Sequence, residues 1–169
     1  MELKEALLAR RSCRKYTDEL VSDEDINELM HAAMSGPSAM NKRPWEFYAI
    51  QDQEVLKKIV KCLLFANYGA KAAIVVVGDL GRALPLGMKE FWIQDCSAAT
   101  ENILLRATDL GLGSVWCGTY PRKNIISKIQ EVLGLKEKQI PLSVVLLGHP
   151  KNEPEPRDQY EEKRVHIIK

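Results

Sequence analysis

The chain has 169 residues, of which 46% are hydrophobic, which is enough for one packed domain and too few for two of ordinary size. Its 24 Lys and Arg residues nearly balance 23 Asp and Glu residues, so the net charge is +1. This balance excludes an extended surface for nucleic acid or for an anionic membrane, and it confines any basic site to a local cluster. We expect a single domain over residues 1–169, with residues 150–169 as a charged tail.

The four cysteines, at positions 13, 62, 96 and 117, form neither a CxxC pair nor a cluster with histidine at metal-ligand spacing. The sequence therefore predicts no zinc site, no redox dithiol and no other metal centre. The first residues contain no apolar run typical of a secretion signal. The longest apolar stretch, residues 72–77, is far shorter than the roughly 20 residues of a membrane-spanning helix. We expect a cytoplasmic protein with reduced thiols and no membrane partner.

Hydrophobic periodicity divides the chain into helices and strands. Ser22 and Asp25 have the spacing of a helix cap before the second helix. The longest helix should cover residues 91–110, where small and apolar residues recur at helical spacing without an internal Gly or Pro. In chain order, the pattern predicts helices at 3–7, 26–33, 54–64, 91–110 and 121–133, strands at 45–50, 73–77, 114–117 and 142–147, and a further candidate strand at 165–168.

Helices and strands interleave and the helices dominate, which predicts a layered α+β or α/β domain. The G-x-G-x-x-G fingerprint of dinucleotide-binding folds is absent. The tail after residue 150 has little core of its own, so we expect it to wrap over a neighbour rather than to hang free.

A basic cluster follows the first helix. Arg10, Arg11, Ser12 and Arg14 place three guanidinium groups and a hydroxyl within five residues, an arrangement suited to binding a phosphate through charge-assisted hydrogen bonds. For an isolated RRSxR pattern, a solvated basic turn is the more frequent explanation. The cluster alone does not decide between the two.

A proline-rich loop begins 25 residues later. It reads PSAMNKRPW over residues 37–45, and its two prolines fix the backbone while Ser38 and Asn41 offer donors and acceptors to the edge of a heterocycle. Without its context, a turn that leads into a strand is a sufficient explanation.

Together the two segments resemble the FMN-dependent nitroreductase family, whose members begin with an RRSxR-type phosphate motif followed by a PSxxNxQPW-type loop. The resemblance continues through DCSAATEN at 95–102, GLGSVWCG at 111–118, GHP at 148–150 and the charged tail. It therefore covers essentially the whole chain in order. The resemblance implies a three-layer α/β/α sandwich with a mixed, mainly antiparallel sheet, a long central helix and a C-terminal tail swapped onto a partner subunit.

By this resemblance the protein binds FMN in the interface of a homodimer. Arg10, Arg11, Ser12 and Arg14 would hold the phosphate and ribityl end. Residues of the proline-rich loop would come from the partner subunit and cover the ring system, and the backbone of the 116–118 segment would lie along the flavin edge. The cofactor-binding residues implied in these two segments are Pro37, Ser38, Ala39 and Asn41, and Trp116, Cys117 and Gly118.

The tail departs from the family pattern. Relatives place a Lys-x-Arg pair near the phosphate, whereas this chain has Arg157-Asp158-Gln159. The resemblance assigns Arg157 to the site and leaves open whether Arg164 replaces the missing second cation. Arg43 stands where the family often has Gln, which adds charge at the rim without affecting the FMN assignment.

The implied reaction is hydride transfer from NADH or NADPH through FMN to a small electron-poor acceptor such as a nitroaromatic compound, a quinone or an activated alkene. Donor and acceptor would use one pocket in turn, which predicts ping-pong kinetics. Because the cofactor performs the chemistry, we assign no catalytic side chain. Cys117 has no neighbouring base, and a cysteine among apolar residues is usually a small buried hydrophobe.

Two alternatives remain. The same scaffold supports reductive dehalogenation and flavin destruction, although a longer lid than the 64–89 region allows usually accompanies them. A non-catalytic flavin carrier, or a regulator that binds nucleic acid through the basic cluster, belongs to another class. The near-zero net charge and the lack of a recognition helix weigh against nucleic acid.

Overall fold

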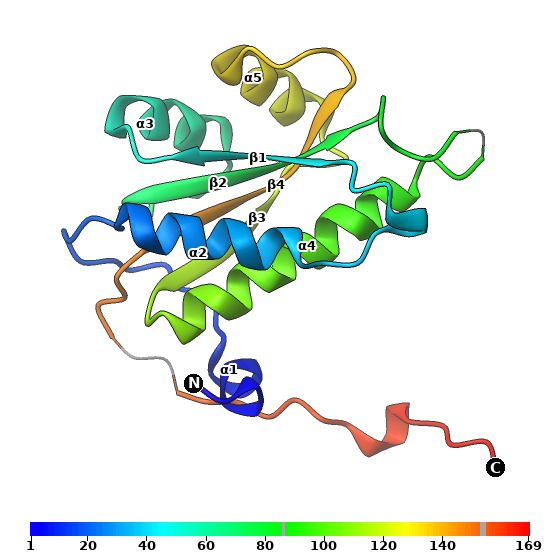
Figure 1. Ribbon diagram of the computed structural model, residues 1–169. Coiled ribbons are helices and arrows are strands. Elements are labelled where there is room, and N and C mark those ends of the chain that lie inside the picture. The colour runs from blue at the N-terminus through cyan, green and yellow to red at the C-terminus, as the bar shows by residue number, and fades with distance from the viewer. Residues whose placement is uncertain (86, 153–154) are drawn as a thin grey trace.

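The computed structural model describes residues 1–85, 87–152 and 155–169. Helices and strands alternate along most of the chain, as the periodicity predicts (Figure 1). The elements are α1 (Leu3–Ala9), α2 (Asp23–Met34), the 3₁₀ turn η1 (Ala39–Asn41), β1 (Trp45–Ile50), α3 (Gln53–Cys62), β2 (Ala72–Asp79), α4 (Phe91–Asp109), β3 (Gly113–Gly118), α5 (Lys123–Leu133), β4 (Gln139–Gly148) and the 3₁₀ turn η2 (Glu162–Arg164).

The four strands form one sheet in the order β1-β2-β4-β3, and every neighbouring pair is antiparallel. The parallel contribution is an isolated bridge between Ser12 and Ser114 on the outer side of β3. Helices α2 and α4 cover one face of the sheet, and α3 and α5 cover the other (Figure 1). This arrangement confirms the predicted layered α+β fold with a mainly antiparallel sheet.

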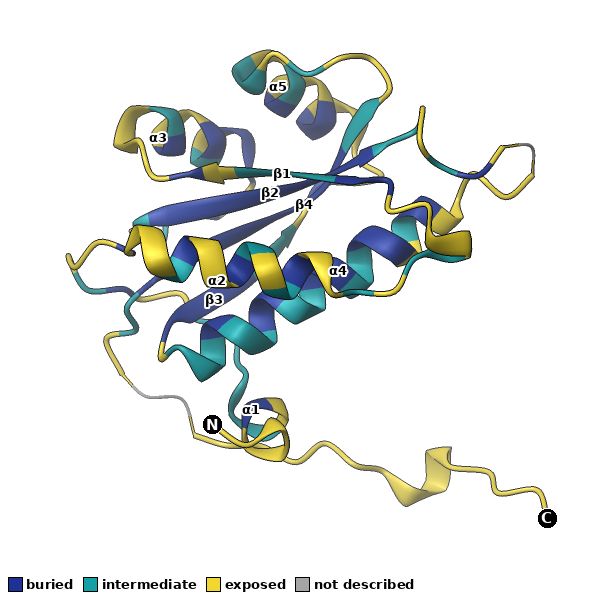
Figure 2. Cartoon of the chain, in the orientation of Figure 1, coloured by how far each residue is buried: buried dark blue, intermediate teal, exposed yellow. Residues whose placement is uncertain are grey.

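The core lies on both faces of the two central strands. Along β2, Ile74 and Val76 pack toward α2 and α4, while Val75 and Val77 pack toward α3 and α5. Strands buried on both faces read as continuous apolar runs rather than alternating ones, which explains the patterns at 72–77 and 142–147. Figure 2 shows these strands as the most buried part of the molecule.

The long helix α4 is the element that most of the other parts contact. Its 19 residues contact α1, α2, η1 and the sheet. Ile103 is fully buried at its centre. Its sequence forms one uninterrupted helix because Ala, Ser, Thr and Leu follow one another without a helix breaker.

Several predicted element boundaries shift. Helix α5 begins at Lys123 rather than at Pro121. Strand β4 begins at Gln139, before Pro141, because a bulge opposite Val76 and Val77 accommodates a residue that has no N–H to donate. The cap of α2 is as predicted, since the Ser22 hydroxyl oxygen accepts a hydrogen bond from the Asp25 amide at 3.0 Å.

The tail leaves the body of the protein beside α1. Its Arg157 amide donates to the Leu8 carbonyl at 2.9 Å, and the rest extends away from the sheet (Figures 1 and 2). Residues 165–168 form no strand within this chain, which differs from the prediction. Their side chains are exposed.

Candidate functional site

A cavity of about 900 Å³ lies where the basic cluster meets the start of β3 and the segment after β4. This volume falls within the range of small-molecule and cofactor sites. The charged groups on its wall are mostly cations, Arg11, Arg14 and Lys15, with one carboxylate from Glu19. The other lining residues are Met1, Ala9, Ser12, Cys13, Thr17, Thr108, Gly111, Leu112, Gly113, His149, Pro150, Asn152 and Pro156.

Backbone pairing fixes the position of the basic cluster. The Cys13 amide donates to the Ser114 carbonyl at 2.8 Å, beside the Ser12–Ser114 bridge. On the other side, the Thr17 amide donates to the His149 carbonyl at 2.9 Å. The segment therefore runs from the outer edge of β3 to the residues just after β4, and three of the residues predicted to bind phosphate, Arg11, Ser12 and Arg14, line the cavity.

Tyr16 holds this segment against the sheet. Its ring is buried against Gly148 and Gly113, and its hydroxyl donates to the Cys13 carbonyl at 2.8 Å. Burial raises the pKa of this phenol well above its ordinary value, so it remains a neutral donor. Tyr16 thereby shapes the cavity without lining it.

Arg14, the last residue of the basic cluster, lies over the ring of Tyr68. Its guanidinium carbon is 5.9 Å from the centre of the Tyr68 ring, a cation–π distance. Burial raises the pKa of the Cys117 thiol, and the nearby positive charges of Arg14 and Arg122 partly oppose this. Cys117 is thus a protonated, half-buried thiol at neutral pH, which agrees with a packing role rather than a nucleophilic one.

Arg10 is oriented differently from the other predicted phosphate ligands. It does not line the cavity, and its Nε lies 3.3 Å from Oε1 of Glu101 on α4. Both side chains are partly exposed, so this pair contributes little stability by itself.

Strand β3 carries the predicted Trp116, Cys117 and Gly118 at the edge of the sheet. In a strand, successive residues direct their backbone groups to alternate sides. The Ser114 carbonyl accepts from Cys13 on the outer side, and the Gly118 carbonyl accepts from Arg122 Nη2 at 2.6 Å. By the same alternation, Trp116 directs its N–H to the outer edge, away from β4.

The proline-rich loop forms η1 against the start of α4 (Figure 1). Its Ala39 amide donates to Oδ1 of Asp95 at 2.8 Å, and Asp95 is 6% exposed. The predicted cover residues do not line the cavity of their own chain, because η1 and the cavity are at different ends of α4. These predicted residues are Pro37, Ser38, Ala39 and Asn41.

Of the two tail cations considered for the site, neither Arg157 nor Arg164 lines the cavity. Pro156 does line it, and Arg157, the next residue, is fixed through its backbone amide to α1. Arg164 lies in η2, where its Nε is 3.0 Å from Oε2 of Glu161. Within one chain, therefore, Arg164 is paired with its own neighbour.

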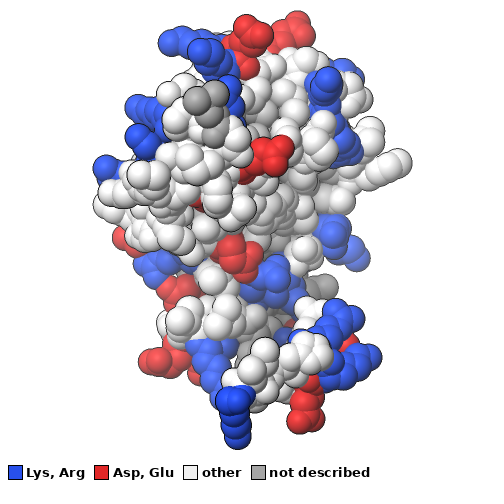
Figure 3. All heavy atoms as spheres, turned by 90° about the vertical axis from the view of Figure 1, so that its right-hand side faces the viewer, with Lys and Arg blue, Asp and Glu red and all other residues white. Residues whose placement is uncertain are grey.

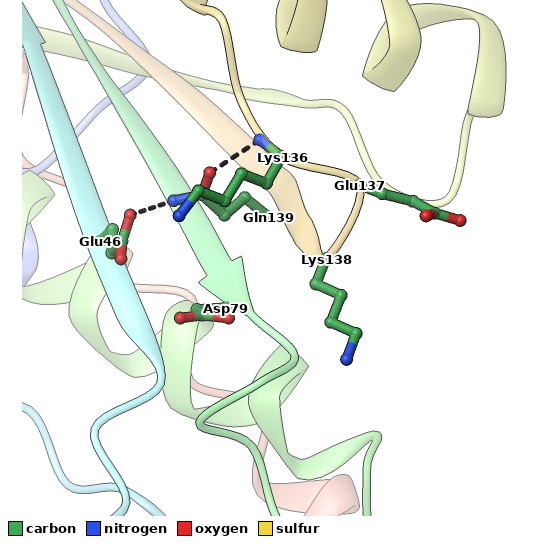
Figure 4. A pocket seen from close by; sticks show the side chains of 6 residues that line it. All are labelled: Glu46, Asp79, Lys136, Glu137, Lys138 and Gln139. Atoms are coloured by element: carbon green, nitrogen blue, oxygen red, sulfur yellow. Dashed lines mark hydrogen bonds between the residues drawn. The ribbon is translucent and has the colours of Figure 1, made fainter.

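A second, smaller cavity of about 320 Å³ lies at the opposite edge of the sheet (Figure 4). Gln139 joins two of its walls, since it donates to Glu46 Oε2 at 2.5 Å and accepts from the Lys136 amide at 2.8 Å. Figure 4 also shows Glu137 pointing away from the other lining residues. None of the predicted site residues is in this cavity.

Two residues of the site region, Tyr16 and Tyr68, reach it through chain folding and have no signal in the sequence. Asp95 and His149 belong to the 95–102 and 148–150 segments that carry the family resemblance, but the sequence assigns them no role. His149 lines the large cavity with its Nε2 3.7 Å from Glu19 Oε1. Within the described ranges, no cluster of His, Cys, Asp and Glu fits a metal ion, and no helix is long and apolar enough to cross a membrane.

Comparison with known proteins assigns the family. The nitroreductase family model matches residues 7–79 and 64–149. The chain belongs to the nitroreductase family. It is 46% identical over 165 residues to an Archaeoglobus fulgidus protein described as an NADH dehydrogenase/NAD(P)H nitroreductase, covering 95% of this chain and 94% of the relative.

Solved structures agree with this family. A Parabacteroides distasonis protein with the same description superposes with a TM-score of 0.90 and 36% identity, over 98% of this chain and 96% of the other. A nitroreductase from Desulfovibrio desulfuricans, solved in complex with FMN, gives a TM-score of 0.84 and 27% identity, over 100% and 98% of the two chains. The nitroreductase fold thus extends over the whole described chain.

Proposed function

We propose that the protein is an FMN-dependent oxidoreductase that uses NADH or NADPH to reduce small electron-poor acceptors, including nitroaromatic compounds and quinones. The observation that carries the proposal is the cavity of about 900 Å³ into which Arg11, Ser12 and Arg14 converge beside β3. Its cationic wall fits a phosphate-bearing cofactor, and a family member of the same fold has been solved with FMN.

The basic cluster fits the phosphate end of FMN. Arg11 and Arg14 offer planar guanidinium groups that can bind phosphate oxygens in pairs, and the Ser12 hydroxyl adds a third donor. Arg10 is within the same segment, and its partly exposed side chain is paired with Glu101. Arg157, one residue beyond the cavity wall, supplies a further cation on the tail side.

The edge of β3 fits the ring end of the cofactor. Trp116 presents a backbone N–H on the outer side of the strand, and Gly118 has no side chain to block an approaching ring. When bound, FMN supplies the ring that accepts a hydride from NAD(P)H and passes electrons to the acceptor. The chain itself positions the cofactor, provides positive charge near it and limits access of water.

A second copy of the chain completes the site in this proposal. Residues 37–41 are at the surface, away from the cavity of their own chain, and are therefore available to cover a partner's cofactor. The tail has the exposed apolar residues of an unfinished interface: Ile167 is 77% exposed and Ile168 is 98% exposed. Both observations support a homodimer with the tail on the partner subunit.

The acceptor is expected to be small, and neutral aromatic compounds suit the surface near η1. In Figure 3, uncharged surface spreads across the middle of the upper half, with Lys and Arg at its sides and Asp and Glu at its top and near its centre. Met40 in η1, Met88 just before α4 and Phe91 at its start are exposed apolar residues. If donor and acceptor occupy one open pocket in turn, the mechanism is ping-pong. Double-reciprocal plots of initial rate against NAD(P)H concentration, measured at several fixed acceptor concentrations, will then be parallel lines.

The first test is the absorbance spectrum of the purified protein before and after anaerobic addition of NADH or NADPH. An FMN spectrum that bleaches supports the proposal. A colourless protein that fails to bind added FMN contradicts it and returns the basic cluster to a solvated turn.

A matched set of variants tests the assigned residues. Arg11→Ala and Arg14→Ala should each weaken FMN binding about tenfold or more, because each removes a charge-assisted hydrogen bond. Lys4→Ala, an exposed cation on α1 that does not line the cavity, is the control and should bind FMN as the wild type does. Equal FMN affinity in all three variants would contradict the placement of the phosphate.

A further inference from the structure

The segment Ser38–Arg43, which contains η1, has an unusual backbone. Three of its residues lie in the left-handed region although none is glycine: φ is 48° at Met40, 51° at Asn41 and 45° at Arg43. For residues with a Cβ atom this conformation is strained, and it persists only where surrounding structure holds it in place. Contacts with neighbouring groups must therefore hold this segment in its conformation.

Contacts within the segment fix only its local shape. The Asn41 amide donates to the Ser38 carbonyl at 3.0 Å, and the Arg43 amide donates to the Ser38 hydroxyl oxygen at 2.9 Å. These bonds close the turn on itself. They do not determine where the turn sits on the rest of the protein.

The bond from Ala39 to Asp95 does determine it. Among the residues that the structure describes, this 2.8 Å hydrogen bond is the one that joins the segment to another element. Asp95 is buried in the first half of α4, the helix at the centre of the fold. Since α4 is packed on the sheet, the Asp95 carboxylate gives the exposed turn an attachment point on the core of the protein (Figure 1).

Burying the Asp95 carboxylate inside the protein lowers stability unless a favourable contact compensates for it. The ion pairs within the described ranges include none with Asp95. A buried carboxylate without a cation is less favourable than an apolar side chain of similar size. Its compensation is the N–H of Ala39, a hydrogen bond strengthened by the charge of the acceptor.

We propose that Asp95 is a positioning residue for the cofactor site: its carboxylate fixes the strained segment Ser38–Arg43 in the place from which it covers the flavin of the partner subunit. This inference rests on the proposed function. Asp95 acts through Ala39 and does not itself contact the cofactor. Losing the bond leaves the turn folded locally but misplaced, which loosens the cover over the ring.

The test compares Asp95→Ala with Asp95→Asn, which keeps an acceptor oxygen. In Asp95→Ala the dissociation constant for FMN and the KM for the acceptor should rise about tenfold, as expected for a lost hydrogen bond to a charged group, while kcat at saturating FMN stays within about threefold. Asp95→Asn should stay close to the wild type in all three. A purely structural role would not produce this division between KM and kcat or the rescue by Asn.

Asn102→Ala is the matched control. Asn102 is also on α4, and its side chain donates to the Ala32 carbonyl on α2 at 3.1 Å, so the variant loses one tertiary hydrogen bond that does not involve the turn. It should leave FMN affinity and KM unchanged. An Asp95→Ala protein that behaves like Asn102→Ala, or an Asp95→Asn protein as impaired as Asp95→Ala, would overturn the proposal.

A measurement on the wild type avoids dependence on variant folding. Amide hydrogen exchange followed by NMR, without added cofactor, should show the Ala39 amide protected by comparison with the Met40 amide in the same turn. An Ala39 amide that exchanges as fast as that of Met40 would overturn the proposal even if no variant folds. This result is independent of flavin chemistry, so a failure of the bleaching test and a failure of the Asp95 assignment can be told apart.

Discussion

A side chain at Gly113 would lower the stability of the fold and also change the shape of the cavity, because Gly113 lies against the basic cluster. A Cβ atom at this position would lie 2.7 Å from Sγ and 2.8 Å from Cβ of Cys13, distances that real Cβ atoms do not adopt. Gly113→Ala must therefore push the basic cluster away from β3. Overpacking of this kind costs about 1–3 kcal/mol, which for a chain of this size lowers Tm by about 2–12 °C.

The matched control is Gly118→Ala on the same strand. A Cβ atom at Gly118 meets nothing within 4 Å, and the backbone of neither glycine lies in the left-handed region. Thermal unfolding followed by circular dichroism should show a lower Tm for Gly113→Ala and no decrease for Gly118→Ala. If the two variants unfold at the same temperature as the wild type, the close approach of the basic cluster to β3 is wrong.

A double-variant cycle locates the clash. Cys13→Gly removes both of the atoms nearest the new methyl group, so Gly113→Ala should cost at least about 1 kcal/mol less in that background than in the wild type. Urea unfolding of the four proteins measures this difference. Equal costs in the two backgrounds would mean that the destabilisation arises elsewhere. The same displacement should also weaken FMN binding, because Ser12 and Arg14 belong to the segment that moves.

Three further predictions follow from individual environments. Ile103→Ala should destabilise the protein by about 2–5 kcal/mol in urea unfolding because it leaves a cavity in a fully buried part of α4, whereas Leu105→Ala, only partly buried on the same helix, should cost clearly less. Lys71 holds the pKa of Asp18 below its ordinary value, so the stability from this pair is present above about pH 4 and is lost as the pH falls through the lowered pKa; Asp18→Asn should reduce the difference in unfolding free energy between pH 7 and pH 3. Because burial raises the pKa of Cys117, iodoacetamide should alkylate it slowly at pH 8 in the FMN-free protein and faster at higher pH, and rapid labelling at pH 8 measured by peptide mass spectrometry would contradict this.

The sequence by itself determined the layered class and the helices and strands up to residue 148, whereas the candidate strand at 165–168 does not form within this chain. Apolar runs at 73–77 and 142–147 predicted strands, and the uninterrupted pattern at 91–110 predicted the central helix, because these features depend on local periodicity. The same holds for the motifs. Residues 10–14 and 37–45 are short segments whose chemistry is visible without knowledge of their surroundings.

Only the tertiary structure decided which of these residues lie together. Ser12 lies beside Ser114, and Tyr16 beside Gly148, through contacts between distant parts of the chain that no local pattern encodes. Only the structure shows that Arg10 pairs with Glu101 and that the Ala39 amide donates to Asp95. The neighbours of these side chains depend on how α4 packs against residues 10–14 and 37–45. Periodicity in the sequence indicates only which face of an element is buried.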